Sequence, residues 1–167
     1  MQQKYTPSYP DLMEVQFAPG EHNSSLRAKK SFSTGDIIAD LSKAYLVPQK
    51  TRFTVQVGVD QHIELGSDLV YMNHSCEPNA AFDVSSGDSS QWKAIALKDI
   101  AKGSELTFFY PSTEWDAAEP FECKCGTESC LKIFQGANSI ATETLKKQAY
   151  ISRHIWQLVE ERDGGKL

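Results

Sequence analysis

The sequence predicts a mainly β fold of several small sheets, followed by helices at the C-terminal end. The first two thirds of the 167 residues contain short alternating or apolar segments, separated by turn-forming residues. Helical periodicity appears only after Cys130. Two similar strand–turn–strand units within the β region favour small sheets over a parallel α/β sheet.

Strands are expected at six places in the β region: residues 12–17, 53–57, 63–65, 80–84, 92–97 and 105–109. The clearest alternation runs from Phe53 to Val57 and ends at a turn formed by residues 58–60. Residues 85–90 are serine, glycine and aspartate, a composition typical of a hairpin loop.

The two similar units share the spacing of four positions. Ala28, Phe32, Gly35 and Ile38 recur as Ala96, Ile100, Gly103 and Leu106. A short polar turn precedes each glycine. We therefore expect two similar strand–turn–strand structures.

The C-terminal part predicts two helices, at residues 140–150 and 151–162. In the second, the apolar residues that fall on one face are Ile151, Ile155, Leu158 and Val159. This stripe is expected to pack in the core, with a partner site as the alternative. Residues 163–165, Asp-Gly-Gly, end the helix.

Length and composition indicate one globular domain. Hydrophobic residues make up 40% and charged residues 23% of the chain, ordinary values for a globular protein. No apolar run approaches the ~20 residues that span a bilayer, so no membrane partner is expected. The net charge of −5 argues against direct, general binding to nucleic acid phosphates.

Charge is unevenly distributed along the chain. No lysine or arginine lies between Arg52 and Lys93, whereas six acidic residues lie there and four more lie between residues 114 and 122. An acidic surface beside a site would attract a basic or lysine-bearing protein or peptide. A solvated face that keeps the protein soluble explains the charge equally well.

The four cysteines of the chain predict a metal site. Cys123, Cys125 and Cys130 form a C-x-C-x4-C cluster, and Cys76 lies well before it. Four thiolates are the number that a closed tetrahedral zinc site requires. Two disulfides are the alternative in an exported protein, and free or buried thiols are another. Because residues 1–10 are polar and carry no apolar export signal, we expect zinc and an intracellular, cytoplasmic or nuclear location.

Three motifs occur in one order. Residues 73–79 read N-H-S-C-E-P-N, residues 105–110 read E-L-T-F-F-Y, and the three clustered cysteines follow. They resemble the N-H-S-C-x-P-N motif, the E-L-T-x-x-Y motif and the post-SET cysteines of SET-domain protein lysine methyltransferases. Residues 26–38 are similar to that family's opening strand and turn, so the resemblance spans roughly residues 12–134.

The resemblance implies a β-clip-like SET-domain fold with a pseudoknot, in which the chain after the E-L-T-x-x-Y strand threads beneath an earlier loop. It also implies a division into a SET domain at residues 1–111, a zinc-binding post-SET segment at residues 112–135, and a C-terminal helical extension at residues 136–167. The arrangement is similar to a small SET plus post-SET protein without a cysteine-rich pre-SET segment.

By the same resemblance, S-adenosylmethionine binds in one cleft and the substrate lysine enters a narrow channel from the opposite face. The cofactor-binding residues that the resemblance implies are Ser24, Ser25, Leu26, Asn73, His74 and Tyr110. His74 is equally well explained as a structural histidine. The zinc ligands that it implies are Cys76, Cys123, Cys125 and Cys130, in a segment that closes over the channel.

Tyr110 and Phe108 are the residues expected to act in catalysis. A lysine amine has a pKa near 10.4 in water and must lose a proton before it can attack a methyl group. A tyrosine hydroxyl at the channel floor can orient the nitrogen lone pair, and the alternative for Tyr110 is a packed ring with a solvated hydroxyl. Phe108 lacks a hydroxyl, which permits higher methylation states, and it is equally well explained as a core strand residue.

The sequence therefore predicts an S-adenosylmethionine-dependent methyltransferase that acts on lysine side chains of a protein. Two alternatives stay open. One is a SET-like scaffold that binds cofactor or peptide without methylating it, and the other is reuse of the pocket for different small-molecule chemistry. They stay open because residues 22–26 lack the family's glycines and residues 39–41 lack its Y-x-G-E segment.

Overall fold

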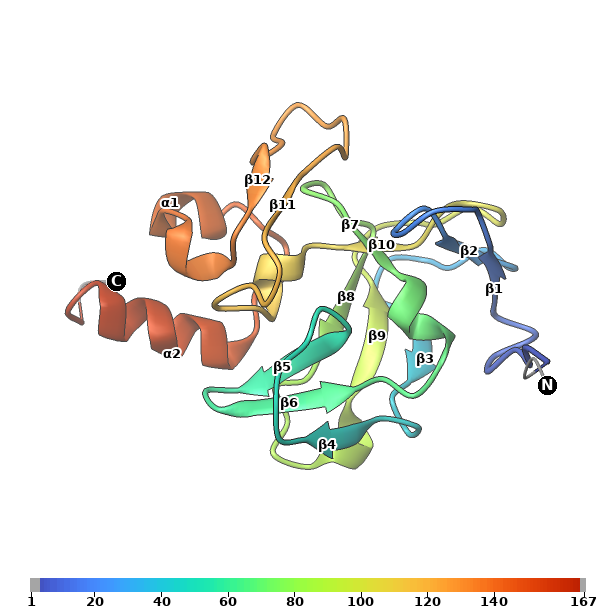
Figure 1. The fold of residues 1–167 in the computed structure, drawn as a ribbon, viewed down its shortest axis with the longest axis horizontal. Coiled ribbons are helices and arrows are strands. Elements are labelled where there is room, and N and C mark those ends of the chain that lie inside the picture. The colour runs from blue at the N-terminus through green and yellow to red at the C-terminus, as the bar shows by residue number, and fades with distance from the viewer. Residues whose placement is uncertain (1–3, 166–167) are drawn as a thin grey trace.

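The computed structural model describes residues 4–165 and is mostly β, as predicted (Figure 1). Its strands are β1 Met13–Gln16, β2 Ser25–Ala28, β3 Ile37–Asp40, β4 Tyr45–Val47, β5 Thr54–Gly58, β6 Gln61–Glu64, β7 Asn73–His74, β8 Ala80–Asp83, β9 Lys93–Ala96, β10 Thr107–Phe108, β11 Phe121–Glu122 and β12 Ile133–Phe134. Its helices are the 3-10 turns η1 Asp68–Tyr71, η2 Ser89–Gln91, η3 Tyr110–Ser112 and η4 Ala137–Ser139, and the α-helices α1 Thr142–Leu145 and α2 Arg153–Arg162. None of the helices in the described range combines the length and apolar composition that crossing a bilayer requires.

The largest sheet has the strand order β3-β9-β8-β10-β7. Strand β10 is parallel to both of its neighbours, with Phe108 level with His74 on one side and Ala80 on the other. Because β10 occupies the slot between β7 and β8, the loop of residues 75–79 that links those two strands crosses it. This crossing agrees with the pseudoknot that the resemblance implies, and the mainly β fold of several small sheets is confirmed.

The two similar strand–turn–strand units pair with each other. Phe32 and Ile100 exchange both backbone hydrogen bonds, at 2.9 and 2.8 Å. The amide of Gly35 donates to the Ala96 carbonyl at 2.8 Å, and the amide of Gly103 donates to the Ala28 carbonyl at 2.7 Å. Both glycines have φ near +90°, a conformation that disfavours a side chain. The residues with the repeated spacing therefore form a reciprocal antiparallel pairing between the two units.

The smaller sheets surround this centre. Strands β1 and β2 form a hairpin, and β4, β6 and β5 form a three-stranded sheet with β5 at one edge (Figure 1). The predicted strand at residues 105–109 is shorter than expected. Only Thr107 and Phe108 join the large sheet, because Leu106 donates its amide to the Leu26 carbonyl and Glu105 bridges to Arg27. These contacts attach β2 to the start of β10.

The C-terminal region forms a second core. Its fully buried members Leu145, Ile155 and Val159 pack with Cys76 and Phe109. Of the predicted stripe, Ile155 and Val159 of α2 and Ile151 just before it lie in this core, whereas Leu158 is half-buried outside it. Core residues thus come from all three predicted divisions of the chain, whose boundaries at residues 111 and 135 stay predictions.

The predicted helix at residues 140–150 is wrong for most of its length, because only Thr142–Leu145 are α-helical. Tertiary contacts compete with the helical hydrogen bonds beyond Leu145. The Tyr150 hydroxyl donates to Asp83 at 3.2 Å, and the Ser152 amide donates to the Ser112 carbonyl at 2.9 Å. The chain therefore leaves the helix, and α2 begins anew at Arg153.

Candidate functional site

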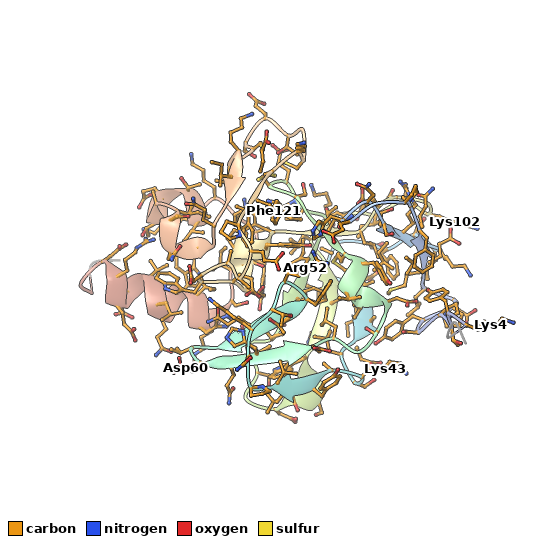
Figure 2. All side chains as sticks on the ribbon, in the orientation of Figure 1. Lys4, Lys43, Arg52, Asp60, Lys102 and Phe121 are labelled. Carbon is orange, nitrogen blue, oxygen red and sulfur yellow. The ribbon has the colours of Figure 1, made fainter. Side chains whose placement is uncertain are left out.

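A cavity of about 690 Å³ lies where four parts of the fold meet. Its walls come from β5 and the loop before it, from η1 and β7, from β10 and η3, and from the β11–β12 hairpin. Arg52 and Phe121 both line it, and both lie near the middle of the molecule in Figure 2. The volume is that of a pocket for a small molecule or cofactor.

Tyr110 lies at the centre of the cavity, where η3 follows β10. Its ring packs against Phe108, His74 and Phe134, with centroid distances of 4.7, 5.2 and 5.5 Å. The hydroxyl donates a 3.3 Å hydrogen bond to the Met72 carbonyl. Burial raises the pKa of Tyr110 to about 12, so the phenol stays neutral at physiological pH. The predicted catalytic hydroxyl is therefore held in place and protonated.

His74 links Tyr110 to the cysteines. Its Nδ1 accepts a 3.1 Å hydrogen bond from the Tyr110 amide, and burial lowers the pKa of the imidazole to about 4. A neutral ring that accepts at Nδ1 carries its proton on Nε2, which lies 3.3 Å from the Cys76 sulfur. The side chain of His74 thus positions the backbone of η3, and it also lines the cavity.

Asn73 lines the cavity, and its side-chain Nδ2 group is already hydrogen-bonded. The Nδ2 group donates to the Ser24 carbonyl at 2.9 Å and to Glu105 Oε1 at 3.1 Å. Within the described residues the Oδ1 atom accepts no hydrogen bond, which leaves an acceptor for a ligand. Of the other residues predicted to bind cofactor, Ser25 and Leu26 are buried and neither they nor Ser24 line the cavity.

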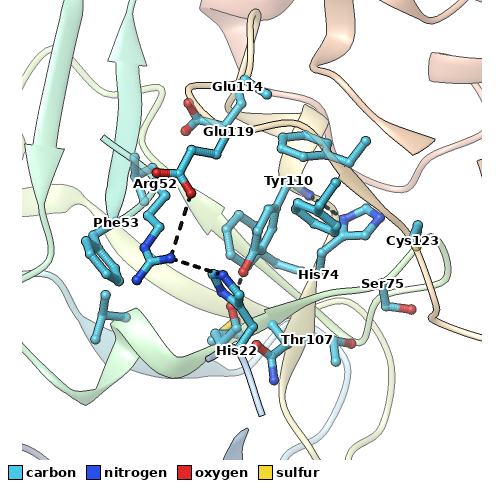
Figure 3. A pocket seen from close by; sticks show the side chains of 18 of the residues that line it. His22, Arg52, Phe53, His74, Ser75, Thr107, Tyr110, Glu114, Glu119 and Cys123 are labelled. Atoms are coloured by element: carbon cyan, nitrogen blue, oxygen red, sulfur yellow. Dashed lines mark hydrogen bonds and ion pairs between the residues drawn. The ribbon is translucent and has the colours of Figure 1, made fainter. Parts of the chain in front are cut away.

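His22 and Asn23 line the cavity instead, and the sequence did not single them out. His22, two residues before Ser24, has φ of +62°, which places its backbone in the left-handed region. The ring contacts Arg52 at 3.1 Å, and Arg52 also pairs with Glu119 at 3.7 Å (Figure 3). The three residues connect distant segments at the cavity mouth, and no local sequence signal identifies them.

Phe108 belongs to both the core and the cavity. Its ring is 6% exposed, packs on Phe82 with centroids 4.7 Å apart, and still lines the cavity beside Tyr110. The two interpretations of Phe108 are therefore compatible. The β11–β12 hairpin adds Phe121 and Phe134 to the same aromatic wall.

Glu114 is a further cavity residue that the sequence did not single out, although it lies in the acidic stretch of residues 114–122. Its Oε1 accepts hydrogen bonds from the Gln56 amide at 2.8 Å and the Thr113 hydroxyl at 3.3 Å. Burial raises the pKa of this carboxyl to about 7, against the effect of these hydrogen bonds and of Lys50. A carboxyl that changes charge near neutral pH therefore lies four residues after Tyr110.

The four cysteines come together beside the cavity. Their sulfur atoms all lie within 4.8 Å of one another, and those of Cys76 and Cys123 are 3.9 Å apart. Tetrahedral zinc with bonds of ~2.3 Å separates its sulfur ligands by about 3.8 Å. The Leu131 amide also donates to the Cys76 sulfur at 3.3 Å, a contact that suits a thiolate. The predicted ligand set thus has the spacing that a zinc ion needs.

Comparison with known proteins agrees with this geometry. The model of the SET domain family matches residues 23–111. Methyltransferase flvH of Aspergillus flavus is 35% identical over 153 residues, which cover 92% of this chain and 84% of that protein. The H3 lysine-9 specific histone-lysine N-methyltransferase dim-5 of Neurospora crassa is 39% identical over 75 residues, covering 36% of this chain and 23% of its own.

A third relative and a solved structure extend the comparison. The H3 lysine-4 specific histone-lysine N-methyltransferase of Aspergillus fumigatus is 27% identical over 128 residues, covering 65% of this chain and 10% of its own. The crystal structure of KRYPTONITE in complex with mCHG DNA and SAH superposes with a TM-score of 0.55 at 22% identity, over 72% of this chain and 28% of that one. The chain thus spans most of the Aspergillus flavus relative. It spans less than a quarter of the Neurospora crassa and Aspergillus fumigatus histone methyltransferases.

Proposed function

The chain belongs to the SET-domain family of methyltransferases, and on this premise we propose that it transfers methyl groups from S-adenosylmethionine to lysine side chains of a protein. The observation that carries the proposal is the neutral Tyr110 hydroxyl, fixed by the Met72 carbonyl inside a cavity walled by aromatic rings. Such a hydroxyl can orient an amine for in-line attack, and positioning supplies much of the rate in a reaction of this type.

The residues present fit the proposed cofactor. An amino-acid end carries an ammonium group, which needs an acceptor, and Asn73 Oδ1 is such an acceptor in the cavity wall. Glu105 lies 3.1 Å from the Asn73 side chain and adds negative charge there. When bound, S-adenosylmethionine supplies an electrophilic methyl group on a sulfonium. In this proposal Asn73 and the backbone near His22 hold the cofactor, while Tyr110 faces the acceptor amine.

The aromatic wall also suits the acceptor. Burial among apolar rings disfavours an ammonium relative to a neutral amine, so it promotes the form that can attack. Phe108 and Phe134 exclude water on either side of the Tyr110 ring. Water exclusion strengthens the hydrogen bond from Tyr110 to its partner and protects the methyl donor from hydrolysis.

We also propose that the four cysteines hold one structural zinc ion. Four sulfur ligands leave no open coordination position, so the ion would act in folding and not in the chemistry. It would join the loop of residues 75–79 to the β11–β12 hairpin, whose phenylalanines line the cavity. The zinc site would therefore hold one wall of the cavity in place.

A lysine-bearing protein is the proposed substrate because the cavity is acidic and because two relatives are named as histone H3 lysine methyltransferases. The acidic side chains in its lining are Glu105, Glu114, Glu119 and Glu122. The basic side chains in the lining are Arg52 and Lys124, fewer than the acidic ones, so the surplus charge is negative and attracts a basic substrate. The KRYPTONITE structure is a complex with DNA, whereas for this chain we propose no nucleic acid partner because its net charge is −5.

Two measurements, made one after the other, test the proposal. Calorimetry with S-adenosylmethionine should give a saturable 1:1 binding isotherm. Transfer of labelled methyl groups to lysine-rich proteins, followed by mass spectrometry, should then place the label on lysine nitrogens. A protein that binds the cofactor but labels no member of a broad panel would instead be a non-methylating scaffold, and one that binds no cofactor would overturn the proposal.

A further inference from the structure

We propose that Glu114 binds the acceptor amine as an alkylammonium ion and takes its proton before methyl transfer. This inference rests on the proposed methyltransferase function. Glu114 would set the charge of the acceptor amine, whereas Tyr110 would orient the amine. The ligand chemistry is a primary or secondary alkylammonium, supplied either by a lysine side chain or by a free small amine.

The two carboxylate oxygens of Glu114 have different environments. Oε1 accepts from the Gln56 amide and from the Thr113 hydroxyl, and these bonds fix the plane of the group. Oε2 accepts no hydrogen bond from the described residues, and the half-buried side chain lines the cavity. A carboxylate with one anchored oxygen and one oxygen open to a cavity is a receptor for a cation.

Glu114 is also positioned relative to Tyr110. Its amide donates a 2.9 Å hydrogen bond to the Tyr110 carbonyl, so the two residues occupy one rigid turn. Figure 3 shows both side chains in the same cavity. An amine held on Oε2 therefore lies in the same cavity as the Tyr110 side chain, toward the Glu119 side of it. Lys50, whose charge acts to lower the pKa of Glu114, is itself engaged by Asp116 at 3.1 Å.

The edge of β5 restricts the shape of the acceptor. An extended peptide often binds by adding a strand to a free sheet edge. Here the Gln56 amide is engaged by Glu114, and the Gln56 side chain accepts from the Trp115 amide at 2.9 Å. The edge is thus occupied at Gln56. This favours an acceptor that enters as an alkyl chain ending in an amine, which a lysine side chain or a small amine satisfies.

The proton transfer is balanced without a further reagent. The ammonium gives one proton to the Glu114 carboxylate, leaving a neutral amine and a neutral carboxylic acid. The nitrogen lone pair forms the new N–C bond as the C–S bond to the methyl group breaks, and that bonding pair stays on sulfur. Glu114 then releases its proton to solvent. Burial raises the pKa of Glu114 to about 7, closer to that of an amine than an exposed carboxyl is.

Titratable and charged groups near Glu114 come from several other elements, and they include His22, Arg52 and Glu119 of the same cavity. Lys50 lies on the loop before β5, Tyr110 begins η3, and His154 of α2 lies behind Thr113, whose carbonyl it contacts at 2.8 Å. Burial raises the pKa of Tyr110 to about 12 and lowers that of His154, so both are neutral near pH 7. Glu114, unlike Tyr110 and His154, therefore changes charge near pH 7.

The test uses the full chain as purified and n-butylammonium chloride as the probe. The backbone amide resonance of Gln56 reports the protonation of Glu114, because that amide donates to the carboxylate. We expect this resonance to titrate near pH 7, and we expect n-butylammonium to shift the midpoint downward because a cation stabilises the charged carboxylate. Neutral n-butanol should leave the midpoint unchanged. A midpoint that ignores n-butylammonium, or that responds equally to n-butanol, would overturn the proposal.

Two matched variants remove one negative charge each from the same cavity. Glu114→Gln keeps an acceptor for the Gln56 amide and should bind n-butylammonium at least about tenfold more weakly. Glu119→Gln loses a charge that pairs with Arg52 at the mouth, and it should weaken binding much less than Glu114→Gln does. Equal loss in both variants would indicate a general field effect and would contradict a specific role for Glu114.

A second pair of ligands identifies the source of the ammonium. If the acceptor is a protein lysine, a tripeptide with a central lysine should bind through Glu114 more tightly than n-butylammonium does. If it is a free small amine, the tripeptide should be excluded while n-butylammonium still binds. Either result supports ammonium binding, and the second contradicts the proposed protein substrate. Calorimetry with S-adenosylmethionine on Glu114→Gln should give the wild-type affinity, so failure of cofactor binding is recognised separately.

Discussion

The amide of Gln56 donates a 2.8 Å hydrogen bond to Glu114, and this bond joins the edge of β5 to the turn that begins at Tyr110. A carboxyl group thus takes the place that a neighbouring strand would occupy. Its burial has a thermodynamic cost whenever it is ionised. The same feature that closes the sheet edge therefore makes the stability of the protein depend on pH.

Glu114→Gln should remove part of that pH dependence. Burial raises the pKa of Glu114 from its ordinary value of 4.5 to about 7. A raised folded-state pKa contributes stability that is fully present below pH 4.5 and is lost as pH rises through 7. The difference has an upper bound of about 3 kcal/mol, reduced by solvent in the cavity. Urea unfolding at about pH 5 and about pH 8 should show the variant gaining stability relative to wild type at the higher pH.

Glu119→Gln is the control for this measurement, because Glu119 is exposed and no burial cost attaches to its charge. Its unfolding free energy should follow the wild-type pH profile. Parallel profiles for wild type and Glu114→Gln would show that Glu114 ionises in the folded state as easily as in the unfolded state.

Tyr110→Phe should abolish most methyl transfer while leaving S-adenosylmethionine affinity nearly unchanged. The substitution removes only the hydroxyl that donates to the Met72 carbonyl, and the ring contacts with Phe108 and His74 stay. Loss of one preorganised group at a reaction centre costs about 10²–10³-fold in turnover. Tyr71→Phe is the matched control, since that ring packs on Phe17 and is not among the cavity residues. Undiminished turnover in Tyr110→Phe would remove this hydroxyl from the mechanism.

Phe108→Tyr should shift the products toward fewer methyl groups. The new hydroxyl would extend from a ring that lines the cavity beside Tyr110, where it can hold the amine or a water molecule by a hydrogen bond. An amine held in this way has less freedom to turn its lone pair toward a second methyl donor. Mass spectrometry of the labelled product gives the distribution directly. An unchanged distribution would place the limit on methylation elsewhere in the cavity.

Local patterns in the sequence predicted the parts of the fold that depend on local geometry. The shared spacing around Gly35 and Gly103 identified two similar units, because each needs a glycine at φ near +90° and buried residues at fixed offsets. The same holds for the cysteine cluster, whose ligand number and spacing are sufficient to indicate a metal. That these units pair reciprocally was not predicted, because pairing is a long-range property.

Other features depend on contacts that sequence reasoning could not anticipate. The helix expected at residues 140–150 ends early, and the chain beyond it is held by hydrogen bonds of Tyr150 and Ser152 to distant residues. In the sequence Glu114 is one acid among several, and its burial depends on Gln56, 58 residues away. In the stretch of residues 22–26, which lacks the family's glycines, the positive φ lies at His22. In each case tertiary packing overrides a local preference.

Asn73→Ala should weaken S-adenosylmethionine binding. The variant loses the free Oδ1 acceptor, and a hydrogen bond to a charged group contributes roughly 1.5–3 kcal/mol. It also loses the ties to Ser24 and Glu105, so the β2 end of the wall should become more mobile. Calorimetry that finds equal affinity in wild type and Asn73→Ala would place the cofactor elsewhere.

Metal content tests the zinc proposal, and the protein purified without chelator should contain one zinc per chain. Removal of the ion should loosen residues 121–134, because the ligand bonds supply much of the folding free energy of so short a hairpin. Hydrogen exchange should therefore accelerate in β11 and β12 after chelation or in Cys130→Ser.

Ser129→Ala is the control, because it changes the residue next to Cys130 without removing a sulfur atom. Ser129 donates a 2.8 Å hydrogen bond to Glu77, and its replacement should leave the metal bound. Because Phe121 and Phe134 form the wall next to Tyr110, metal loss should also weaken cofactor binding. Zinc-free protein with the same exchange rates and the same affinity would show that the hairpin is held by packing alone.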